Sequence, residues 1–256
     1  MTEFTVDKFR IDTVSFDRET NSFIIIEYKK SQNFSVIDQG YAYLSLILNR
    51  KADFVLKFNE VFGKSENKKF FDWSQSRVIF VSPSFTDFQI QAINFKDLPI
   101  ELWEVKAYEN KIVRYNPIKS KQSSLATIST ISKPNKTISS VNKEIVVYTE
   151  GQLLDCSSQN IIEAYHAIKE IVYQINSDVE EKIKKTMISY YADGKGLLWV
   201  SPQKNKLVLY FRKGIYKDKN GIELPPGWGN CPELRLSSDE INLYSIKKLV
   251  KSANSY

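Results

Sequence analysis

Hydrophobic and polar positions in the first part of the chain follow strand spacing and then helix spacing. Residues 8–17 alternate between apolar and polar side chains, and residues 22–30 contain the apolar run FIII. Two strands joined by the polar turn RETN (18–21) form the hairpin that this pattern predicts. Residues 35–50 carry apolar side chains at helical spacing, and Ser35 suits the N-cap position.

The pattern continues as a mixture of strands and helices as far as residue 115. Residues 53–58 and 76–82 predict strands, the second of them buried on both faces. A helix near 86–94 and a strand at 100–108 follow. We therefore expect residues 1–115 to form an α/β domain with a mixed sheet and flanking helices.

The segment 116–145 has no sustained helical or strand period. It contains ten Ser or Thr residues, and five lysines face the single acid Glu144. Such a composition is typical of a flexible linker. A short strand within ATISTI (126–131) is an open alternative.

The remaining residues, 146–256, predict a compact α+β domain. An amphipathic helix at 161–175 is followed by three strand-like runs, a Gly/Pro loop and a closing helix capped by Ser237 or Ser238. The strands are expected at 185–192, 196–203 and 206–213, the loop at 221–233 and the helix at 237–253.

The net charge of +6 is unevenly distributed. Residues 1–115 are neutral, with 16 basic and 16 acidic side chains, whereas the linker carries four of the excess positive charges. A uniformly basic DNA-binding face is therefore not expected from charge alone. The sequence contains no long apolar stretch, no secretory leader and only two isolated cysteines, so we predict a cytoplasmic protein without a membrane segment.

The constellation with the clearest chemistry is Asp12 followed by Glu27 and Lys29. Residues two apart on a strand share a face, so Glu27 and Lys29 are neighbours. A hairpin turning at 18–21 brings Asp12 beside Glu27, since each lies about seven residues from the turn centre. Two carboxylates suit Mg²⁺ or Mn²⁺, and a bound metal lowers the pKa of water. A solvated surface ion pair is the alternative interpretation.

The string RIDTVSFD…NSFIIIEYKK…SVIDQGYAYLSLIL resembles the PD-(D/E)xK nuclease superfamily over about residues 1–115. The resemblance implies a restriction-endonuclease-like fold in which Asp12 and Glu27 bind the metal. It implies that Lys29 is the catalytic lysine, that Gln39 is an auxiliary polar residue and that DNA is the substrate. The superfamily places an acid on a helix ahead of Asp12, a position for which Glu3 is the candidate here. From about Tyr148 the chain resembles a domain of unknown function sometimes labelled a predicted transport protein.

Basic residues that could contact nucleic acid lie near the predicted site and in the C-terminal domain. They are Lys30, Lys206, Arg212 and Lys213. Five aromatic residues on adjacent predicted strands could stack bases, although we expect alternate ones to form the core. These are Tyr190, Tyr191, Trp199, Tyr210 and Phe211.

Other candidate residues favour structural roles. His166 is the only histidine, which argues against multi-histidine zinc sites and a Ser-His-Asp hydrolase. Cys156 and Cys231 are expected to be partly buried thiols. The GWGN stretch (227–230) lacks phosphate-loop spacing and predicts a turn anchored by Trp228.

Two functions follow from these observations. The first is a metal-dependent nuclease that hydrolyses DNA at Asp12, Glu27 and Lys29. The second is a non-catalytic protein, built on a degenerate nuclease scaffold, that binds nucleic acid or a protein partner, including a second copy of itself. A regulatory or defence-system subunit that shares these roles with another chain is a more distant alternative.

Overall fold

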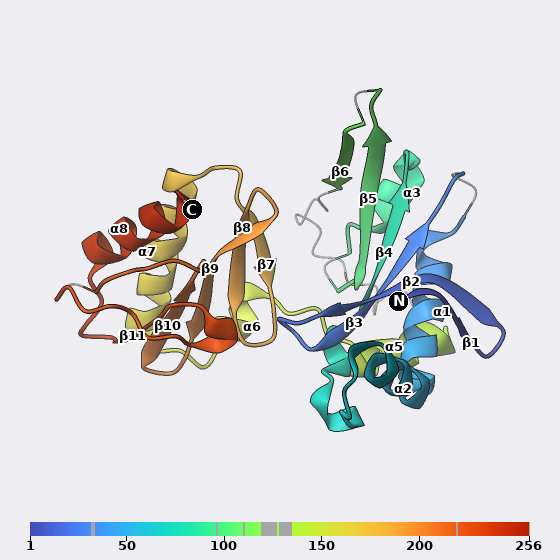
Figure 1. Ribbon diagram of the computed structural model, residues 1–256, viewed down its shortest axis with the longest axis horizontal. Helices are drawn as coiled ribbons and strands as arrows, with labels where there is room; N and C mark the ends of the chain where they lie inside the picture. Colours follow the sequence, from blue (N-terminus) through green and yellow to red (C-terminus); the bar gives the residue numbers. More distant parts are fainter. Residues whose placement is uncertain are drawn as a thin grey trace. The chain divides into compact units, whose positions relative to one another are not determined.

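The computed structural model describes residues 1–31, 34–95, 97–109, 111–118, 127, 135–218 and 220–255. The chain divides into two compact units, Met1–Val147 and Tyr148–Tyr256. Each unit has its own sheet and its own hydrophobic core (Figure 1).

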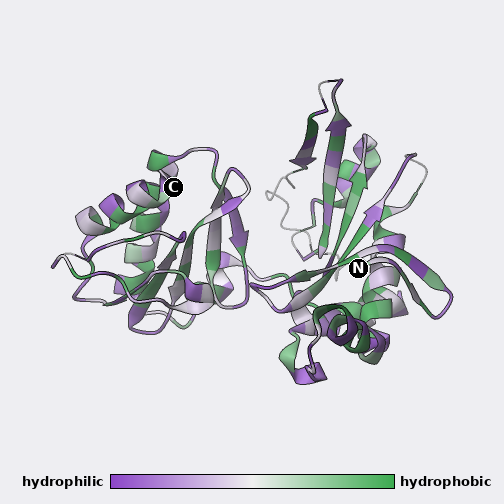
Figure 2. Ribbon diagram, viewed as in Figure 1, coloured by the Kyte–Doolittle hydropathy of each residue, from purple (hydrophilic) through white to green (hydrophobic). Residues whose placement is uncertain are grey.

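The first unit contains a six-stranded sheet in the order β1-β2-β3-β4-β5-β6. Strands β3, β4 and β5 run parallel to one another, and the remaining neighbours are antiparallel. The strands are β1 Thr2–Val6, β2 Phe9–Asp17, β3 Ser22–Tyr28, β4 Arg77–Ser82, β5 Ile100–Ala107 and β6 Val113–Pro117. The strand β4 is coloured mostly hydrophobic in Figure 2, as a central strand should be.

The helices of this unit are α1 Val36–Asn49, α2 Lys51–Phe62, α3 Asp87–Ala92 and α5 Lys136–Glu144, with 3-10 turns at η1 Lys68–Phe70 and η2 Trp73–Gln75. Helices α1, α2 and α5 gather on one side of the sheet (Figure 1). Ser35 caps α1 as predicted, because its side chain accepts a hydrogen bond from the Asp38 amide. Gly40 lets α1 approach the sheet, since a Cβ there would lie 2.2 Å from Ile100 Cδ1.

The strand predicted at 53–58 is wrong, because these residues lie within α2. Phe54, Val55 and Phe58 are buried together, which is the i, i+1, i+4 spacing of a helix face. Gly63 ends the helix in the left-handed region with φ 59°. A short apolar run fits both periods, and the packing of the Phe54 and Phe58 rings against Phe23 of the sheet decides in favour of the helix.

The end of the predicted linker is also wrong, because α5 belongs to the first core. Ile138, Val141 and Ile145 are buried there, and the Tyr41 hydroxyl donates to Asn142 Oδ1 over 2.9 Å. The first two residues of the predicted linker lie in β6. Residues 119–126 and 128–134, and with them all of the possible strand at 126–131 except Thr127, lie outside the described residues.

The second unit contains a five-stranded antiparallel sheet in the order β11-β10-β9-β8-β7. Its strands are β7 Glu180–Ile183, β8 Ile188–Ala192, β9 Lys195–Pro202, β10 Lys206–Phe211 and β11 Glu233–Ser237. Its helices are α6 Glu150–Leu154, α7 Gln159–Ile175 and α8 Leu243–Asn254, with a 3-10 turn at η3 Trp228–Asn230. Helices α7 and α8 lie side by side on one face of the sheet (Figure 1).

Three predicted strands and the long helix of this unit are present, with ends shifted by a few residues. The closing helix begins later than predicted. Asn242 caps α8, and Ser237 instead ends β11, a strand that the pattern did not predict. The α/β and α+β classes predicted from the sequence are confirmed. Within the described part of the chain, no helix is both long and apolar enough to cross a bilayer.

Candidate functional site

The hairpin of β2 and β3 has the register that the sequence predicts. Thr13 pairs with Ile26, so the preceding position on β2, Asp12, is level with Glu27. At that point Asp12 Oδ2 accepts a hydrogen bond from the Tyr28 backbone amide over 2.9 Å. The Asp12 side chain therefore lies at the end of β3, beside Glu27.

Glu27 lies on the helix-covered face of the sheet, in line with Phe23 and Ile25. Its side chain is buried, and Oε1 accepts a hydrogen bond from Lys29 Nζ over 3.0 Å. Among the described residues, Oε2 has no hydrogen-bond partner. An unpaired buried carboxylate oxygen is costly, so it marks a position where a ligand would be stabilised.

Helix α1 supplies two further side chains. Burial raises the pKa of the Tyr43 hydroxyl above its ordinary 10.0, and the negative charges of Glu27 and Asp12 raise it further. Gln39 lies one helical turn before Tyr43 on the same face. Its Oε1 is buried without a hydrogen-bond partner in the described residues. Sequence reasoning named Gln39 but missed Tyr43, although the four-residue spacing could have found it.

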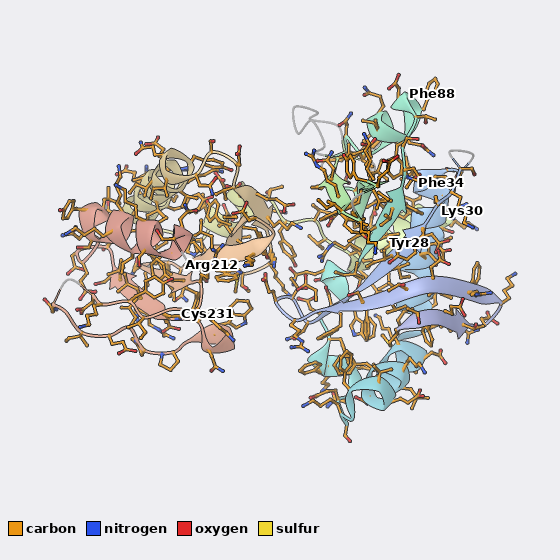
Figure 3. The ribbon with its side chains drawn as sticks, turned by 45° about the horizontal axis from the view of Figure 1, so that its top comes forward. Tyr28, Lys30, Phe34, Phe88, Arg212 and Cys231 are labelled. Atoms are coloured by element: carbon orange, nitrogen blue, oxygen red, sulfur yellow. The ribbon has the colours of Figure 1, made fainter. Side chains whose placement is uncertain are left out.

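The surroundings of Lys29 are aromatic on one side. Its ammonium lies 5.4 Å from the centre of the Phe34 ring, which contacts Phe80 at 5.4 Å between ring centres. Gln89 on α3 donates to the Phe34 carbonyl over 3.0 Å and ties that helix to the site. Figure 3 shows Phe34 and the exposed Lys30, which follows the site on the chain.

The position of the cluster agrees with the topology. Strands β3, β4 and β5 are parallel, and Glu27 lies near the carboxyl end of β3, level with Phe80 of β4. Ligand sites in open α/β sheets occur at the carboxyl ends of parallel strands. The sheet therefore presents Asp12, Glu27 and Lys29 at the edge where such sites form.

The oxygen donors at this edge fit a hard divalent cation. Asp12 and Glu27 supply two carboxylates, and Gln39 adds an amide oxygen without a partner in the described residues. Within the same described part of the chain, no three His, Cys, Asp or Glu side chains cluster at one point. Glu3 does not join the site, because it pairs with Arg10 on the exposed β1–β2 hairpin.

The predicted nucleic-acid contacts of the second unit lie along β10 and just beyond its end. Lys206 begins the strand, and Lys213 follows it. The Arg212 guanidinium donates to the backbone carbonyls of Gly196, Ala192 and Lys195, at 2.8, 3.2 and 3.3 Å. Arg212 therefore holds the turn between β8 and β9.

The cysteines and the histidine occupy different surroundings. Cys156 is exposed, so its predicted partial burial is wrong, whereas Cys231 is buried. Burial raises the pKa of the Cys231 thiol, and the positive charge of Lys213 opposes that change. His166 is half exposed on α7, with Nδ1 3.9 Å from Glu150 Oε1.

A second polar cluster lies between α6, α7 and the sheet of the second unit. Lys169 donates to both Glu150 and Glu181, and the Tyr165 hydroxyl donates to Glu150 Oε2 over 2.8 Å. Burial opposes the charge of Glu150, but the hydrogen bonds from Lys169 and Tyr165 outweigh it and lower its pKa. These mutual contacts indicate a structural network.

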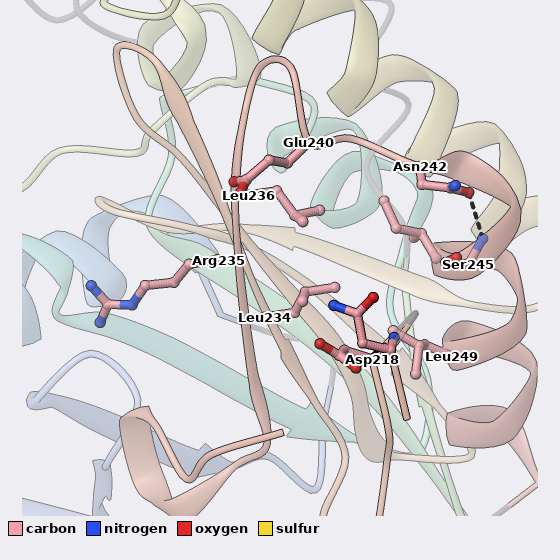
Figure 4. Close-up of a pocket in the computed structure, with 10 residues that line it drawn as sticks. Asp218, Leu234, Arg235, Leu236, Glu240, Asn242, Ser245 and Leu249 are labelled. Atoms are coloured by element: carbon pink, nitrogen blue, oxygen red, sulfur yellow. Dashed lines mark hydrogen bonds between the residues drawn. The ribbon is translucent and has the colours of Figure 1, made fainter. Parts of the chain in front are cut away.

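A pocket of about 170 Å³ opens where the edge strand β11 meets α8 (Figure 4). Leu234, Leu236, Ile246 and Leu249 supply its apolar lining, and Asn242, which accepts a hydrogen bond from the Ser245 amide, also lines it. Arg235 extends away from the other side chains in Figure 4. The volume is below the roughly 300 Å³ of ordinary ligand sites, so this pocket is not the main candidate.

Comparison with known proteins confirms that the second unit resembles a domain of unknown function. Residues 150–242 match a family described as a domain of unknown function, DUF5655. The sequence is also 46% identical over 257 residues to an uncharacterized protein of Haemophilus influenzae, covering 98% of this chain and 84% of that protein. No solved structure matches the chain. These findings give no evidence for a PD-(D/E)xK domain in residues 1–115, so that resemblance stays a prediction. With this identity across nearly its whole length, the chain belongs to the same family as the Haemophilus influenzae protein.

Proposed function

We propose that the first unit is a metal-dependent nuclease that hydrolyses phosphodiester bonds of DNA. The observation that carries the proposal is the convergence of Asp12, Glu27 and Lys29 at the carboxyl end of β3, with a buried unpaired oxygen on Glu27. Charged groups that are held together at such an edge suit a reaction in which negative charge develops on a phosphate.

In this proposal, Asp12 and Glu27 hold Mg²⁺ or Mn²⁺. When bound, the cation supplies Lewis-acid stabilisation of the phosphate and lowers the pKa of water. The Asp12 carboxylate is oriented by the Tyr28 amide, and Glu27 is oriented by Lys29. Both carboxylates are therefore fixed before a ligand arrives, which reduces the entropy lost on binding.

The remaining residues act on the substrate side of the cluster. Lys29 provides an ammonium that can position a water molecule or stabilise the charge on a phosphate oxygen. Gln39 offers an amide that can donate to, or accept from, the attacking water. Tyr43 keeps its proton because its pKa is raised, so its hydroxyl orients a carboxylate or a phosphate oxygen.

A second candidate function is non-catalytic binding of nucleic acid or protein on a degenerate nuclease scaffold. The observation that favours it is the Lys29–Glu27 ion pair, in which the lysine already neutralises the carboxylate. In that case the pair stabilises the sheet edge, and Lys30 contacts the partner from the exposed surface.

Metal binding by the full chain separates the two candidates before any cleavage assay. Calorimetric titration with MnCl₂ is expected to show binding to the wild type that Glu27→Gln removes. The matched control Glu60→Gln changes an exposed acid on α2 and should bind the metal as the wild type does. Absence of binding to the wild type would exclude the nuclease.

Cleavage is then measured on single-stranded and duplex DNA with Mg²⁺ or Mn²⁺. We expect Lys29→Ala to lower the rate by at least about 100-fold while the folded state is kept, since charge stabilisation at the phosphate contributes this much. Retained activity in both Lys29→Ala and Glu27→Gln would contradict the assignment of the site.

A further inference from the structure

The outer face of the five-stranded sheet, opposite α7 and α8, carries aromatic and basic side chains. Alternation along the strands places Tyr190 and Phe211 in the helix-covered core and Tyr191, Trp199 and Tyr210 on the other face. The sequence prediction that alternate aromatic residues form the core is therefore correct. We call the face that bears the other three the outer face.

The strand register aligns a continuous row across the outer face. Tyr210 of β10 is opposite Trp199 of β9, which is opposite Ser189 of β8. The row ends in Glu233 on β11 and Lys182 on β7. Neighbouring strands are about 4.8 Å apart, so the aromatic side chains of this row form one surface.

Trp228 extends that aromatic surface from the η3 turn. Its ring centre lies 5.8 Å from Trp199 and 6.1 Å from Tyr210. Tyr191 contacts the other side of Trp199 at 6.5 Å. Trp228, Tyr210 and Tyr191 are each half-buried, so part of every ring remains accessible.

Two polar atoms beneath this cluster have no hydrogen-bond partner among the described residues. They are Ser189 Oγ, on a fully buried side chain, and Trp199 Nε1, on a side chain that is 7% exposed. These side chains are direct cross-strand neighbours. Polar groups left unpaired in this way are destabilising, so the packing under the exposed rings is not optimised for stability alone.

Charge on the outer face favours an anionic partner. Among the described residues, strand alternation places four basic side chains on this face beside two acids, Glu180 and Glu233. The basic residues are Lys182, Lys206, Arg212 and Arg235, of which Lys182 pairs with Glu180 and Arg235 with Glu233. Lys184 is buried, and its ammonium donates to the Tyr191 hydroxyl over 2.8 Å. The ammonium groups of Lys182 and Lys184 lie 5.6 and 5.5 Å from the centre of the Tyr191 ring.

We propose that the outer face binds single-stranded nucleic acid by stacking bases on Trp228, Tyr210 and Tyr191 and placing phosphates on the surrounding basic side chains. A sheet with accessible rings and basic edges suits this ligand, because every base has a face that stacks. A duplex keeps its bases stacked inside and cannot use these rings. The inference does not rest on the nuclease proposed for the first unit.

Fluorescence anisotropy of a labelled oligothymidylate of about 12 nucleotides tests the proposal with the full chain, in EDTA to prevent cleavage. We expect binding that weakens at least about fivefold in Trp228→Ala, as the loss of one stacked base requires. Lys206→Glu, on the exposed start of β10, should weaken binding and make it less salt-dependent.

Two controls belong to the same experiment. Tyr244→Ala and Lys251→Glu alter exposed residues on α8, on the helix-covered side, and should leave the affinity unchanged. Glu60→Gln, which alters an exposed acid on α2, should also bind as the wild type does. Failure of the wild type to bind the oligonucleotide, tighter binding of the matching duplex, or unchanged affinity in both outer-face variants would overturn the proposal.

Discussion

The two units each hold a lysine among carboxylates, and the two clusters differ in how completely they are paired. Around Lys169, two carboxylates and a tyrosine hydroxyl are joined by hydrogen bonds, and the Glu181 oxygen that lacks a hydrogen bond still lies 3.0 Å from the Lys169 ammonium. Around Lys29, one oxygen of Glu27 has no hydrogen-bond partner in the described part of the chain. The first arrangement is that of a network which stabilises its own fold. The second leaves binding capacity for a ligand.

This difference in pairing predicts that mutations in the first cluster reduce stability and that mutations in the second reduce ligand binding. Removing a member of a satisfied network leaves other buried charges without a partner, so stability falls. At a site with an unpaired buried charge, the folded state is already destabilised by desolvation of that charge. Removing the charge therefore weakens ligand binding while stability is maintained.

Lys169→Met should lower the free energy of unfolding by about 2–3 kcal/mol, because it leaves Glu150 and Glu181 partly buried without their shared cation. Thermal and urea unfolding of the chain measure this loss. Lys57→Met is the control, since it removes an ion pair with the exposed Glu60 on α2 that is worth about 0–1 kcal/mol. Equal losses in both variants would mean that the network has no special role.

Gly40→Ala should cost about 1–3 kcal/mol, because the added Cβ lies 2.2 Å from Ile100 Cδ1 and pushes α1 away from the sheet. The same movement displaces Gln39 and Tyr43 from the candidate site, so metal binding should weaken as well. Gly151→Ala on α6 meets no atom within 4 Å and should be neutral or slightly stabilising. An unchanged melting temperature in Gly40→Ala would contradict this close packing.

Glu27→Gln should change the unfolding free energy by less than about 1 kcal/mol, because the amide keeps the shape and can still accept from Lys29. The wild type should melt at a higher temperature in Mn²⁺, since a ligand of the folded state stabilises it. Glu27→Gln should lose that increase. A large loss of stability without metal would show that Glu27 belongs to a structural network like that of Lys169.

The smallest effect concerns the free energy of unfolding at acidic pH. Because the pKa of Glu150 lies below its ordinary 4.5, its contribution is present above about pH 4.5 and is lost as the pH falls through the lowered value. The difference in unfolding free energy between the wild type and Glu150→Gln should therefore be constant near neutral pH and shrink in acid. A difference that grew on acidification would reverse the sign of this contribution.

Local patterns in the sequence predicted the elements on which the candidate site depends. The hairpin of β2 and β3 has a short polar turn, and a pairing that places Thr13 opposite Ile26 follows from the turn position. The Ser35 cap and the apolar face of α1 could also be predicted from the sequence. The approach of Asp12 to Glu27 could be predicted because it depends only on chain positions within one hairpin.

Elements whose identity depends on distant partners could not be predicted in this way. The run at 53–58 is short and apolar, and only packing against Phe23 and its neighbours makes it part of a helix. Helix α5 has a polar, Ser-rich sequence with few apolar residues. These residues define a buried helix face only because they pack in the core beside α1. Strand β11 follows a Gly/Pro loop and is defined by its ladder with β10.

By itself, the sequence determined the classes of both units, the register of the first hairpin and the identity of the acids and lysine at its end. These features depend on side-chain periodicity and turn chemistry, which act over a few residues. Tertiary structure alone decided that Glu27 is buried with an unpaired oxygen, that Tyr43 lies beside it and that Arg212 holds a turn. Burial and hydrogen-bond pairing depend on which residues meet across the fold, and no local pattern contains that information.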